Sequence, residues 1–370
     1  MPGNRIALFL PSLEGGGAER VMVNLALGFV EEGRQVDLVL VKAEGAYMEL
    51  VSDKVRVVNL QGQRVISSLF RLMKYLREER PVALLSAMDH ANVIAILAKC
   101  FSGVATRIAV SVHSTLSIEV KHAKSWRGKI LPWFINRTYP NADAIIAVST
   151  GVAEDMAQIT SLDYKNIKII YNPVVTQRLL EKQQQAISHP WFQKNQPPVL
   201  LAVGRLTEQK DFTTLIKAFA IIRKQKKCRL LILGEGELRP GLENLINKLD
   251  LTEDVQMPGF VENPYAYMKQ ADVFVLSSAW EGLVTVLIEA MACGTPVVST
   301  DCPSGSREIL VDGKYGRLVP VGDSEALAEA VIQTLEQERQ SESLIKRAND
   351  FTQTASVKKY LEVLDRQSGN

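Results

Sequence analysis

Two glutamates, Glu281 and Glu289, stand on either side of seven mostly apolar residues, and the apolar run ends at Gly294, two residues before Pro296. This ending predicts a helix over 283–293. Eight helical residues separate the carboxylates by a rise of roughly 12 Å, whereas glycosidase carboxyl pairs lie roughly 5–9.5 Å apart. The spacing favours groups that hold the two ends of an elongated ligand. The alternative is a glutamate that complements the helix dipole and a second, solvated one.

The start of the same predicted helix can bind an anion. The backbone N–H groups of Leu283, Val284 and Thr285 have no intrahelical partner there, and the positive end of the helix dipole suits a phosphate. A nucleotide sugar has hydroxyls at both ends and phosphates in the middle. It is therefore a ligand that this stretch and its two glutamates would suit.

A second phosphate-binding pattern follows the predicted strand 199–203. Gly204 is followed by Arg205 and, five residues later, by Lys210, before a helix that Asp211 or Thr213 would cap. Arginine offers a planar fork of donors and lysine a point charge, so the pair can hold phosphate groups. The alternative is two solvated surface cations. A neighbouring loop at 234–237, with two glycines, adds another turn on the same edge of the predicted sheet.

A glycine loop lies near the N-terminus. Strand 6–10 precedes Gly15, Gly16 and Gly17, and a helix over 18–32 then leads to strand 36–41, which together form a βαβ unit. Glycines let a ligand approach the backbone and favour an anion at the helix start. The spacing is not GxGxxG and no acidic residue ends the second strand, so a dinucleotide cofactor is not expected. A tight turn without a ligand is the alternative.

His113 directly follows the predicted strand 107–112, at the strand end where parallel α/β sheets bind their ligands. A structural role for this histidine remains open beside a catalytic one.

The segment 121–137 is basic and aromatic. It contains five basic residues and no acidic one, with apolar side chains interleaved. Such a composition fits an interfacial segment that touches anionic lipid or a lipid-phosphate acceptor; a solvated basic face is the alternative. We select as tentative membrane or acceptor contacts Lys121, Lys124, Trp126, Arg127, Lys129 and Trp133. No nucleic-acid-binding module accompanies the charge, so no nucleic-acid partner is expected.

The composition indicates an ordinary globular protein of two domains, with 370 residues, 46% hydrophobic residues and a net charge of +2. The four cysteines show no CxxC spacing, so reduced structural thiols are expected. The N-terminus enters a strand pattern directly, and no apolar run reaches the roughly 18 residues of a membrane span, so neither a signal peptide nor a spanning helix is expected. We predict a cytoplasmic protein that meets the membrane only at its surface.

Two successive series of alternating strands and helices predict two Rossmann-like α/β domains. The first series has strands at 6–10, 36–41, 83–86, 107–112, 143–148 and 168–171, and the second at 199–203, 229–233, 255–257, 273–276, 297–300 and 317–319. The predicted boundaries are 1–175 for an N-terminal acceptor-binding domain, 176–197 for a Pro- and Gln-rich linker, 198–345 for a C-terminal domain that binds the nucleotide sugar, and 346–370 for a helix that returns to the first domain.

With these motifs in place, the chain resembles the retaining, GT-B-fold glycosyltransferases of family 4, the group 1 glycosyl transferases. The resemblance covers nearly the whole length. It rests on GGGAERV at 15–21, GRLTEQKDF at 204–212, PGF at 258–260 and EGLVTVLIEAMACGTPVVSTDCPSGSREIL at 281–310. It implies a GT-B fold in which two Rossmann-like domains face each other across a cleft.

The resemblance also implies roles for single residues. Arg205 and Lys210 would bind and stabilise the departing diphosphate, Glu289 would hold the ribose, and Glu281 would lie near the hydroxyls of the sugar. The implied catalytic residues are Arg205, Lys210, Glu281 and His113. The implied donor-binding residues are Gly16, Gly17, Gly204, Arg205, Lys210, Glu281, Gly282, Leu283, Val284, Thr285 and Glu289. Many relatives have Phe-Gly-Leu after the first Glu-Gly, whereas Gly282 is followed here by Leu-Val-Thr, a departure that bears on sugar specificity.

The expected activity is retaining transfer of a sugar from a UDP-hexose or UDP-N-acetylhexosamine to a lipid-linked saccharide in bacterial surface-glycan, lipopolysaccharide or glycoprotein assembly. No DxD sequence occurs, so neither a metal nor another cofactor is expected; the two cations and the helix dipole would carry the charge of the phosphates. A nucleotide-sugar epimerase or hydrolase on the same fold and a non-catalytic binding module remain the alternatives.

Overall fold

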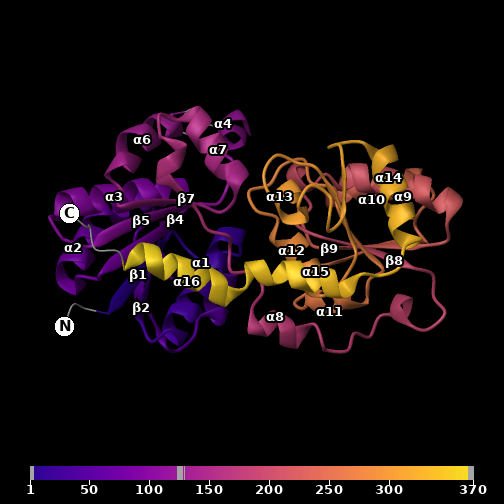
Figure 1. Ribbon diagram of the computed structural model, residues 1–370, viewed down its shortest axis with the longest axis horizontal. Coiled ribbons are helices and arrows are strands. Elements are labelled where there is room, and N and C mark those ends of the chain that lie inside the picture. Colours follow the sequence, from indigo (N-terminus) through magenta and orange to yellow (C-terminus); the bar gives the residue numbers. More distant parts are fainter. Residues whose placement is uncertain (1–3, 123–127, 129, 366–370) are drawn as a thin grey trace. The chain divides into compact units, whose positions relative to one another are not determined.

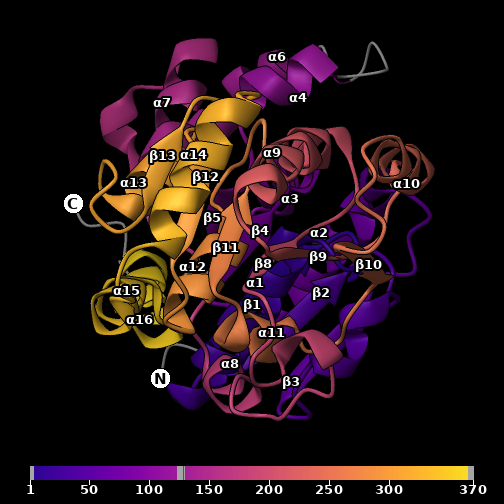
Figure 2. The same ribbon diagram turned by 90° about the vertical axis from the view of Figure 1, so that its right-hand side faces the viewer.

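Two parallel β-sheets, one in each of two compact units, organise the computed structural model, which describes residues 4–122, 128 and 130–365. The first unit comprises Met1–Pro173 together with Gln353–Asn370, and the second comprises Val174–Thr352. Figures 1 and 2 show the elements of both units. All twelve predicted strands are present, in two parallel sheets, so the predicted Rossmann-like α/β fold is confirmed. That the two units face each other across a cleft stays a prediction.

The sheet of the first unit has seven strands in the order β3-β2-β1-β4-β5-β6-β7. The strands are β1 Arg5–Leu10, β2 Gln35–Leu40, β3 Val55–Asn59, β4 Ala83–Ala87, β5 Arg107–Val112, β6 Ala144–Ala147 and β7 Ile167–Ile169. Because the connection from β3 returns past β1 and β2 to β4, right-handed crossovers place the helices before and after this point on opposite faces of the sheet. Helix α1 Gly17–Glu31 therefore covers one face, and α2 Leu69–Glu79, α3 Asp89–Ser102, α6 Leu131–Thr138 and α7 Thr150–Ile159 cover the other.

The strand β3 was not predicted, because its pattern is not that of a buried strand. Three of its five residues are exposed, and its Arg56 reaches across the sheet to the buried Asp37 of β2, with Nη2 and Oδ2 2.5 Å apart. The hydroxyl of Tyr75 donates to the same carboxylate at 2.7 Å. Arg56 also donates to Glu79, which lowers the pKa of that carboxyl. The edge strand is thus held by an ion-pair network in addition to one buried apolar side chain, Val55.

The sheet of the second unit has the order β10-β9-β8-β11-β12-β13. The strands are β8 Val199–Val203, β9 Arg229–Leu233, β10 Val255–Gly259, β11 Val273–Leu276, β12 Val297–Thr300 and β13 Arg317–Val319. One face packs against α9 Phe212–Gln225, α10 Arg239–Lys248 and α14 Ser324–Leu335, whose buried side chains join those of the strands in one core. The remaining helices of the unit are α8 Gln177–Lys182, α11 Pro264–Gln270, α12 Thr285–Ala292, α13 Ser306–Leu310 and α15 Ser341–Ala348.

The segment 176–197, expected to be a linker, is instead a folded part of the second unit. It forms α8, and the backbone carbonyl of Lys182 accepts a hydrogen bond from Asn263 Nδ2 at 2.9 Å. Trp191 is buried, and the guanidinium of Arg229 lies 5.0 Å from its ring centroid. Proline and glutamine suggested a loose connection, but a buried tryptophan fixes the segment to its unit.

The chain re-enters the first unit at residue 353 rather than at 346, because α15 stays in the second unit against α12. The last helix, α16 Gln353–Leu364, buries Val357, Tyr360 and Val363 in the core of the first unit beside α1. Within the described ranges, none of the helices has both the length and the apolar character needed to cross a bilayer.

The contact between α1 and α16 depends on one glycine in the last turn of α1. A Cβ atom placed on Gly28 would lie 2.4 Å from Cγ2 of Val357 on α16. Glycine weakens a helix interior by up to about 1 kcal/mol relative to alanine, so close approach of the two helices is the reason for its presence here. Gly241 in α10 is a matched contrast, because a Cβ there would meet nothing within 4 Å.

We predict that Gly28→Ala destabilises the first unit by about 1–3 kcal/mol, because the added methyl group overpacks the α1–α16 contact. Gly241→Ala should instead stabilise the second unit by about 0.5–1 kcal/mol. Denaturant unfolding of the two variants measures both changes. Stabilisation by Gly28→Ala would contradict the close packing.

Candidate active site

The centre of the candidate site is an ion pair between two loops of the second unit. Lys210, in the loop after β8, places Nζ 2.5 Å from Oε1 of Glu281, in the loop after β11. The strands β8 and β11 are neighbours, and Ala279 N donates to Gln209 O at 2.8 Å between their loops. Ser277 Oγ also donates to the carbonyl of Lys210 at 2.8 Å. The ion pair therefore sits on a backbone framework that joins the carboxyl ends of both strands.

Glu281 is buried, with 8% of its surface exposed, and is hydrogen-bonded by its neighbours. Besides Lys210, it accepts a bond from Ser278 Oγ at 2.7 Å, and Gln209 Nε2 lies 3.3 Å from its second oxygen. In a water-poor site such donors hold a charged carboxylate in place and hold the lysine ammonium with it. Gln209 and Ser278 were missed from the sequence, since nothing in a lone Gln or Ser distinguishes it.

The predicted helical geometry of the two glutamates was wrong. The helix α12 begins at Thr285, so Glu281 lies before it in irregular structure, and the rise and rotation of a helix do not relate the two carboxylates. Glu289 does lie on α12, where the hydroxyl of Tyr265 is 3.4 Å from its Oε1. Gly282, Leu283 and Val284 form the turn between the buried glutamate and the helix.

This turn is held from its other side by the loop after β12. Ser304 Oγ donates to the carbonyl of Gly282 at 2.9 Å, from a backbone with a φ of +69°. A Cβ on the next residue, Gly305, would come within 3.3 Å of Val284 N. The SGS sequence at 304–306 therefore fixes the backbone at the start of α12, a contact that the sequence did not reveal.

Glycines bring the loops after β8 and β9 into backbone contact. A Cβ on Gly234 would lie 1.9 Å from Gly204 O, and one on Gly236 would lie 2.4 Å from Leu206 O. The stem of Lys210 packs over Gly204, whose added Cβ would lie 3.3 Å from Cγ, Cδ and Cε. These glycines let the two loops pack closely and direct Lys210 towards Glu281.

Arg205, in contrast, is exposed, and its guanidinium has no side-chain partner among the residues that the structure describes. Asp211 caps α9 as expected, accepting from Thr214 N at 3.1 Å. The loop after β8 thus carries one exposed cation, Arg205, and one cation, Lys210, that is paired with the loop leading into α12. Nowhere in the described ranges do three His, Cys, Asp or Glu side chains gather as metal ligands would.

In the first unit, the glycine loop already holds an anion that belongs to the chain. Glu19, in the first turn of α1, is buried, and its Oε2 accepts from Gly15 N at 2.6 Å and from Gly16 N at 2.9 Å. Two of the backbone donors that the glycine pattern suggested for a ligand, those of Gly15 and Gly16, are therefore bound to a carboxylate. That Gly16 and Gly17 contact the donor stays a prediction.

His113 follows β5 at the carboxyl edge of the same sheet. Both ring nitrogens are buried and have no hydrogen-bond partner among the described residues. Burial lowers the pKa of His113 to about 4, so the ring is neutral near pH 7. It can donate or accept one hydrogen bond, but it is not charged.

Asp89, a residue that the sequence analysis did not select, begins α3 at the same edge. It is buried and accepts a hydrogen bond from the hydroxyl of Tyr139 at 2.7 Å. Burial and the nearby carboxylate of Glu119 raise the pKa of Asp89 to about 7.

The tentative membrane residues are only partly described. Lys124, Trp126, Arg127 and Lys129 lie outside the described residues. Lys121 is exposed on α4 Leu116–His122. Trp133 is exposed on α6, with the guanidinium of Arg137 5.7 Å from its ring centroid.

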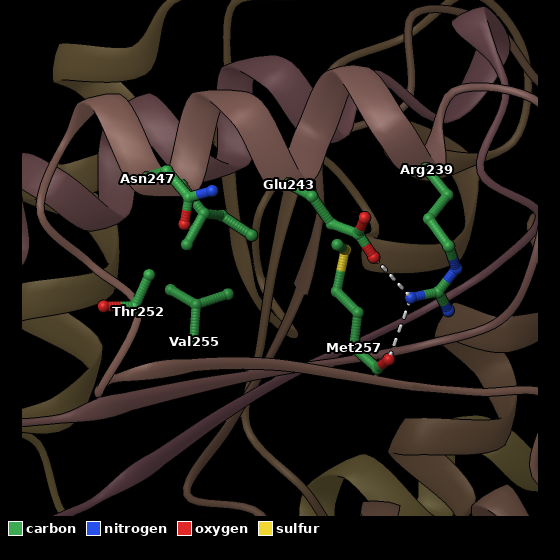
Figure 3. A pocket seen from close by; sticks show the side chains of 7 residues that line it. Arg239, Glu243, Asn247, Thr252, Val255 and Met257 are labelled. Carbon is green, nitrogen blue, oxygen red and sulfur yellow. Dashed lines mark hydrogen bonds and ion pairs between the residues drawn. The ribbon is translucent and has the colours of Figure 1, made fainter.

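A hollow of about 190 Å³ beside α10, at the β10 edge of the second sheet, is distinct from the candidate site. Figure 3 shows that Arg239 in its wall donates to Glu243 and to the carbonyl of Met257. Arg239 also pairs with Glu235. Because these groups already neutralise the cation, the hollow offers no free charge for a phosphate.

Comparison with known proteins identifies the family. Residues 183–351 match the family of glycosyl transferases group 1, and residues 15–178 match Glycosyltransferase Family 4. The N-acetylgalactosamine-N,N'-diacetylbacillosaminyl-diphospho-undecaprenol 4-alpha-N-acetylgalactosaminyltransferase of Campylobacter jejuni is 30% identical over 344 residues, which cover 90% of this chain and 91% of that protein. The chain belongs to the group 1 glycosyl transferases.

A second relative and one solved structure are also similar to this chain. A second Campylobacter jejuni enzyme, GalNAc-alpha-(1->4)-GalNAc-alpha-(1->3)-diNAcBac-PP-undecaprenol alpha-1,4-N-acetyl-D-galactosaminyltransferase, is 27% identical over 97% of this glycosyltransferase and 98% of its own length. The Anabaena protein HepE, solved in complex with UDP, superposes with a TM-score of 0.79 and 21% identity, over 98% of this chain and 99% of that chain. The structural likeness shows the GT-B fold.

The ion pair between Lys210 and Glu281 of this glycosyltransferase predicts that substitutions of its two residues have coupled effects on the stability of the second unit. Lys210→Met and Glu281→Gln should each destabilise the second unit by about 2–4 kcal/mol, because each leaves a largely buried charge without its counter-charge. The double variant should cost less than the sum of the single variants, by about 0.5–3 kcal/mol.

Fluorescence-detected denaturant unfolding measures this coupling in a Trp126→Phe, Trp133→Phe background, so that only Trp191 and Trp280 of the second unit report. Lys217→Met, at an exposed position of α9, is the matched control and should be nearly neutral. Additive effects of Lys210→Met and Glu281→Gln would show that the pair is not coupled.

His113 predicts a pH dependence of stability. Its pKa of about 4 lies below its ordinary value, so the unfolded chain takes up a proton first as the pH falls from about 6.5 to about 4. This one residue should therefore cost the first unit about 2 kcal/mol between pH 7.5 and pH 5.

The measurement compares unfolding of the wild type and of His113→Asn at both pH values. Asp89 contributes a slope of the opposite sign, because its raised pKa makes the folded state bind more protons, but this contribution is common to both proteins and cancels. Equal slopes in the two proteins would contradict a buried, neutral His113.

Proposed function

We propose that this glycosyltransferase is a retaining, metal-independent enzyme that transfers a hexose or N-acetylhexosamine from a UDP-linked donor to a lipid-linked saccharide in bacterial surface-glycan or glycoprotein assembly. The observation that carries the proposal is the group at the carboxyl edge of the second sheet. There, the exposed Arg205 and the held Lys210 lie in a loop hydrogen-bonded to the loop that enters α12. Such an arrangement suits a diphosphate.

The names of relatives support the substrates. The two Campylobacter jejuni enzymes act, by their names, on undecaprenol-linked acceptors and transfer N-acetylgalactosamine, and HepE was solved with UDP. In this chain, Glu289 on α12, hydrogen-bonded by Tyr265, is the group that we assign to the ribose. The acceptor would come from the membrane surface, and we propose that the enzyme acts at the cytoplasmic face of a bacterial membrane.

In the proposed reaction, the bond between the anomeric carbon and the donor phosphate oxygen breaks while positive charge develops on the sugar. Arg205 and Lys210 stabilise the negative charge on the leaving diphosphate, so the barrier falls without a metal. The acceptor hydroxyl attacks the same face and its proton passes to the departing phosphate oxygen. A cation that is already oriented by Glu281 and Ser278 needs little rearrangement at that moment.

We assign Glu281 a positioning role and not that of a general base. Its carboxylate is bound to Lys210 and Ser278, which favours positioning of the ammonium and of the turn at 282–284 beside the transferred sugar. His113, neutral at pH 7, is suited to a hydrogen bond near the reacting centre rather than to a charge. Neither residue is assigned to proton removal.

The test incubates the purified enzyme with UDP-N-acetylhexosamines and UDP-hexoses, with and without an undecaprenyl-diphosphate-linked saccharide, in the presence of EDTA. We expect transfer with retained α configuration, seen by NMR of the product. Arg205→Ala and Lys210→Ala should each lower kcat by about 10²–10³, whereas Lys217→Ala, an exposed cation on α9, should not.

Formation of an epimer or of free sugar at a similar rate without acceptor would contradict transfer. An inverted product would contradict retention, and loss of activity in EDTA would contradict metal independence. Full activity of Lys210→Ala would contradict a catalytic site at this loop.

A further inference from the structure

Exposed apolar side chains of the first unit are concentrated on one helical layer, formed by η2 Val65–Ser68, α2, the end of α3, and α6. Of nine large hydrophobic residues that are exposed among the described part of this unit, six lie there: Ile66, Phe70, Phe101, Ile130, Trp133 and Phe134. These six include every exposed phenylalanine and tryptophan of the described first unit. We call this set the α2–α3–α6 face.

The two most exposed members lie on η2 and at the start of α2. Phe70 is 77% and Ile66 72% exposed, four residues apart, while Leu72, Tyr75 and Leu76 of the same helix are buried. The inner side of α2 is therefore filled, and its outer side carries Phe70 among the exposed basic residues Arg71, Lys74 and Arg77. A single exposed apolar residue needs no explanation, but several large ones gathered on adjoining elements do.

The side chain of Arg77 joins α2 to the end of α3. Its Nη2 donates to Phe101 O at 2.9 Å and its Nε to Ser102 O at 3.2 Å, which holds α2 beside Phe101, itself 60% exposed. Seven residues along α2 separate Arg77 from Phe70, a rise of roughly 10 Å. The apolar groups on both helices thus belong to one surface region.

The charge of this region is positive and largely uncompensated. Residues 64–80 contain five basic and two acidic side chains. One acid, Glu79, pairs with Arg5 and Arg56 on the strands. Arg71 and Arg77 donate to backbone carbonyls, which leaves their charge in place. Of the basic residues, Lys74 has a carboxylate near it, Glu78 at 3.8 Å.

Helix α6 also carries exposed aromatic side chains with an arginine beside them. Trp133 is 58% exposed on α6, Phe134 is exposed beside it, and Arg137 stacks near the Trp133 ring at 5.7 Å. Helices α2 and α6 flank α3 on the same side of the sheet. Aromatic rings with arginines beside them suit the boundary between lipid headgroups and acyl chains, where the ring is buried and the cation meets phosphate.

We propose that the α2–α3–α6 face docks on an anionic lipid bilayer, with Ile66, Phe70 and Phe101 inserted among the headgroups and the basic side chains of 64–80 against lipid phosphates. The inference deepens the proposed function, because a lipid-linked acceptor requires the enzyme at a membrane. Charge complementarity selects this occupant: an anionic bilayer matches both the apolar anchors and the unneutralised arginines.

Docking of a bilayer on the α2–α3–α6 face also fits the position of the carboxyl edge of the first sheet, where the candidate site residues of this unit lie. The segment η2 and the start of α2 follow β3, at the carboxyl edge of the sheet from which the loop of Gly16 and the residue His113 project. Ile66 lies on η2 and Phe70 in the first turn of α2, at this end of the helix. A bilayer held there brings headgroup-level acceptors towards the edge that carries the candidate site residues of the first unit.

The test is flotation of the full chain with vesicles of 30% phosphatidylglycerol in phosphatidylcholine. We expect the wild type to float with the vesicles and Ile66→Ser/Phe70→Ser to partition about tenfold or more weakly, since each large apolar anchor contributes roughly this factor. Leu180→Ser on α8, a 40% exposed residue of the second unit, is the matched control and should float like the wild type. Circular dichroism and unchanged UDP binding verify that the variants are folded.

A second measurement separates this inference from the proposed function. If both hold, Ile66→Ser/Phe70→Ser loses transfer to an acceptor embedded in vesicles about tenfold, while transfer to a short-chain, water-soluble acceptor is unchanged. If the wild type transfers no sugar but its flotation still depends on Ile66 and Phe70, the docking face stands and the proposed function fails.

Three outcomes would overturn the docking face. The first is unchanged flotation of Ile66→Ser/Phe70→Ser. The second is loss of flotation only when Lys121, Lys124, Arg127 and Lys129 are neutralised, which would assign the membrane to the segment 121–137 alone. The third is a dimer in sedimentation that becomes a monomer in the α2 variant, with no vesicle binding by either, which would make the face a contact between copies of this chain.

Discussion

The buried ion pair of Lys210 and Glu281 is the contact on which the second unit's candidate site depends. Two charges taken out of water need each other and need further hydrogen bonds, and Ser278 and Gln209 supply them. Surrounding features serve the same geometry: Gly204 leaves room for the lysine stem, and Ser304 holds the turn after Glu281. The result is a cation whose position is fixed before any substrate arrives, which is the property that electrostatic catalysis requires.

Strand order explains how residues 71 positions apart form this pair. In each unit the sheet runs outward from its first strand in one direction and, after one crossover, in the other, so β8 and β11 become neighbours. Loops from both strands then leave the same carboxyl edge, as they do at the switch point of doubly wound sheets. The same arrangement in the first unit places Gly16, Asp89 and His113 at the ends of β1, β4 and β5.

Much of this architecture could be predicted from the sequence, since twelve strands appear as short apolar runs. The exception, β3, escaped because only Val55 of its five residues is buried and Arg56 pairs with Asp37, so the strand has no apolar run. The helix was predicted to begin at Leu283 and its spacing was applied back to Glu281, whereas α12 begins only at Thr285 and Glu281 pairs with Lys210 in irregular structure. Long-range partners such as Ser304 and Tyr265 carry no local signal, and no spacing rule would select them. Glu19 did carry one: a glutamate three residues after the N-terminal glycine of a helix is the glutamate half of a capping box, whose side chain accepts from the N-cap backbone N–H.

The bond from Glu19 to the glycine loop has a consequence for selectivity among anions. A carboxylate attached to the same helix is present at the backbone donors at a high effective concentration, against which free phosphate or sulfate must compete in the millimolar range. The chain therefore carries its own competitive occupant of a loop that would otherwise attract small anions indiscriminately. A ligand that displaced Glu19 would have to bring binding energy from elsewhere in its structure, so we expect the loop to discriminate against small inorganic anions.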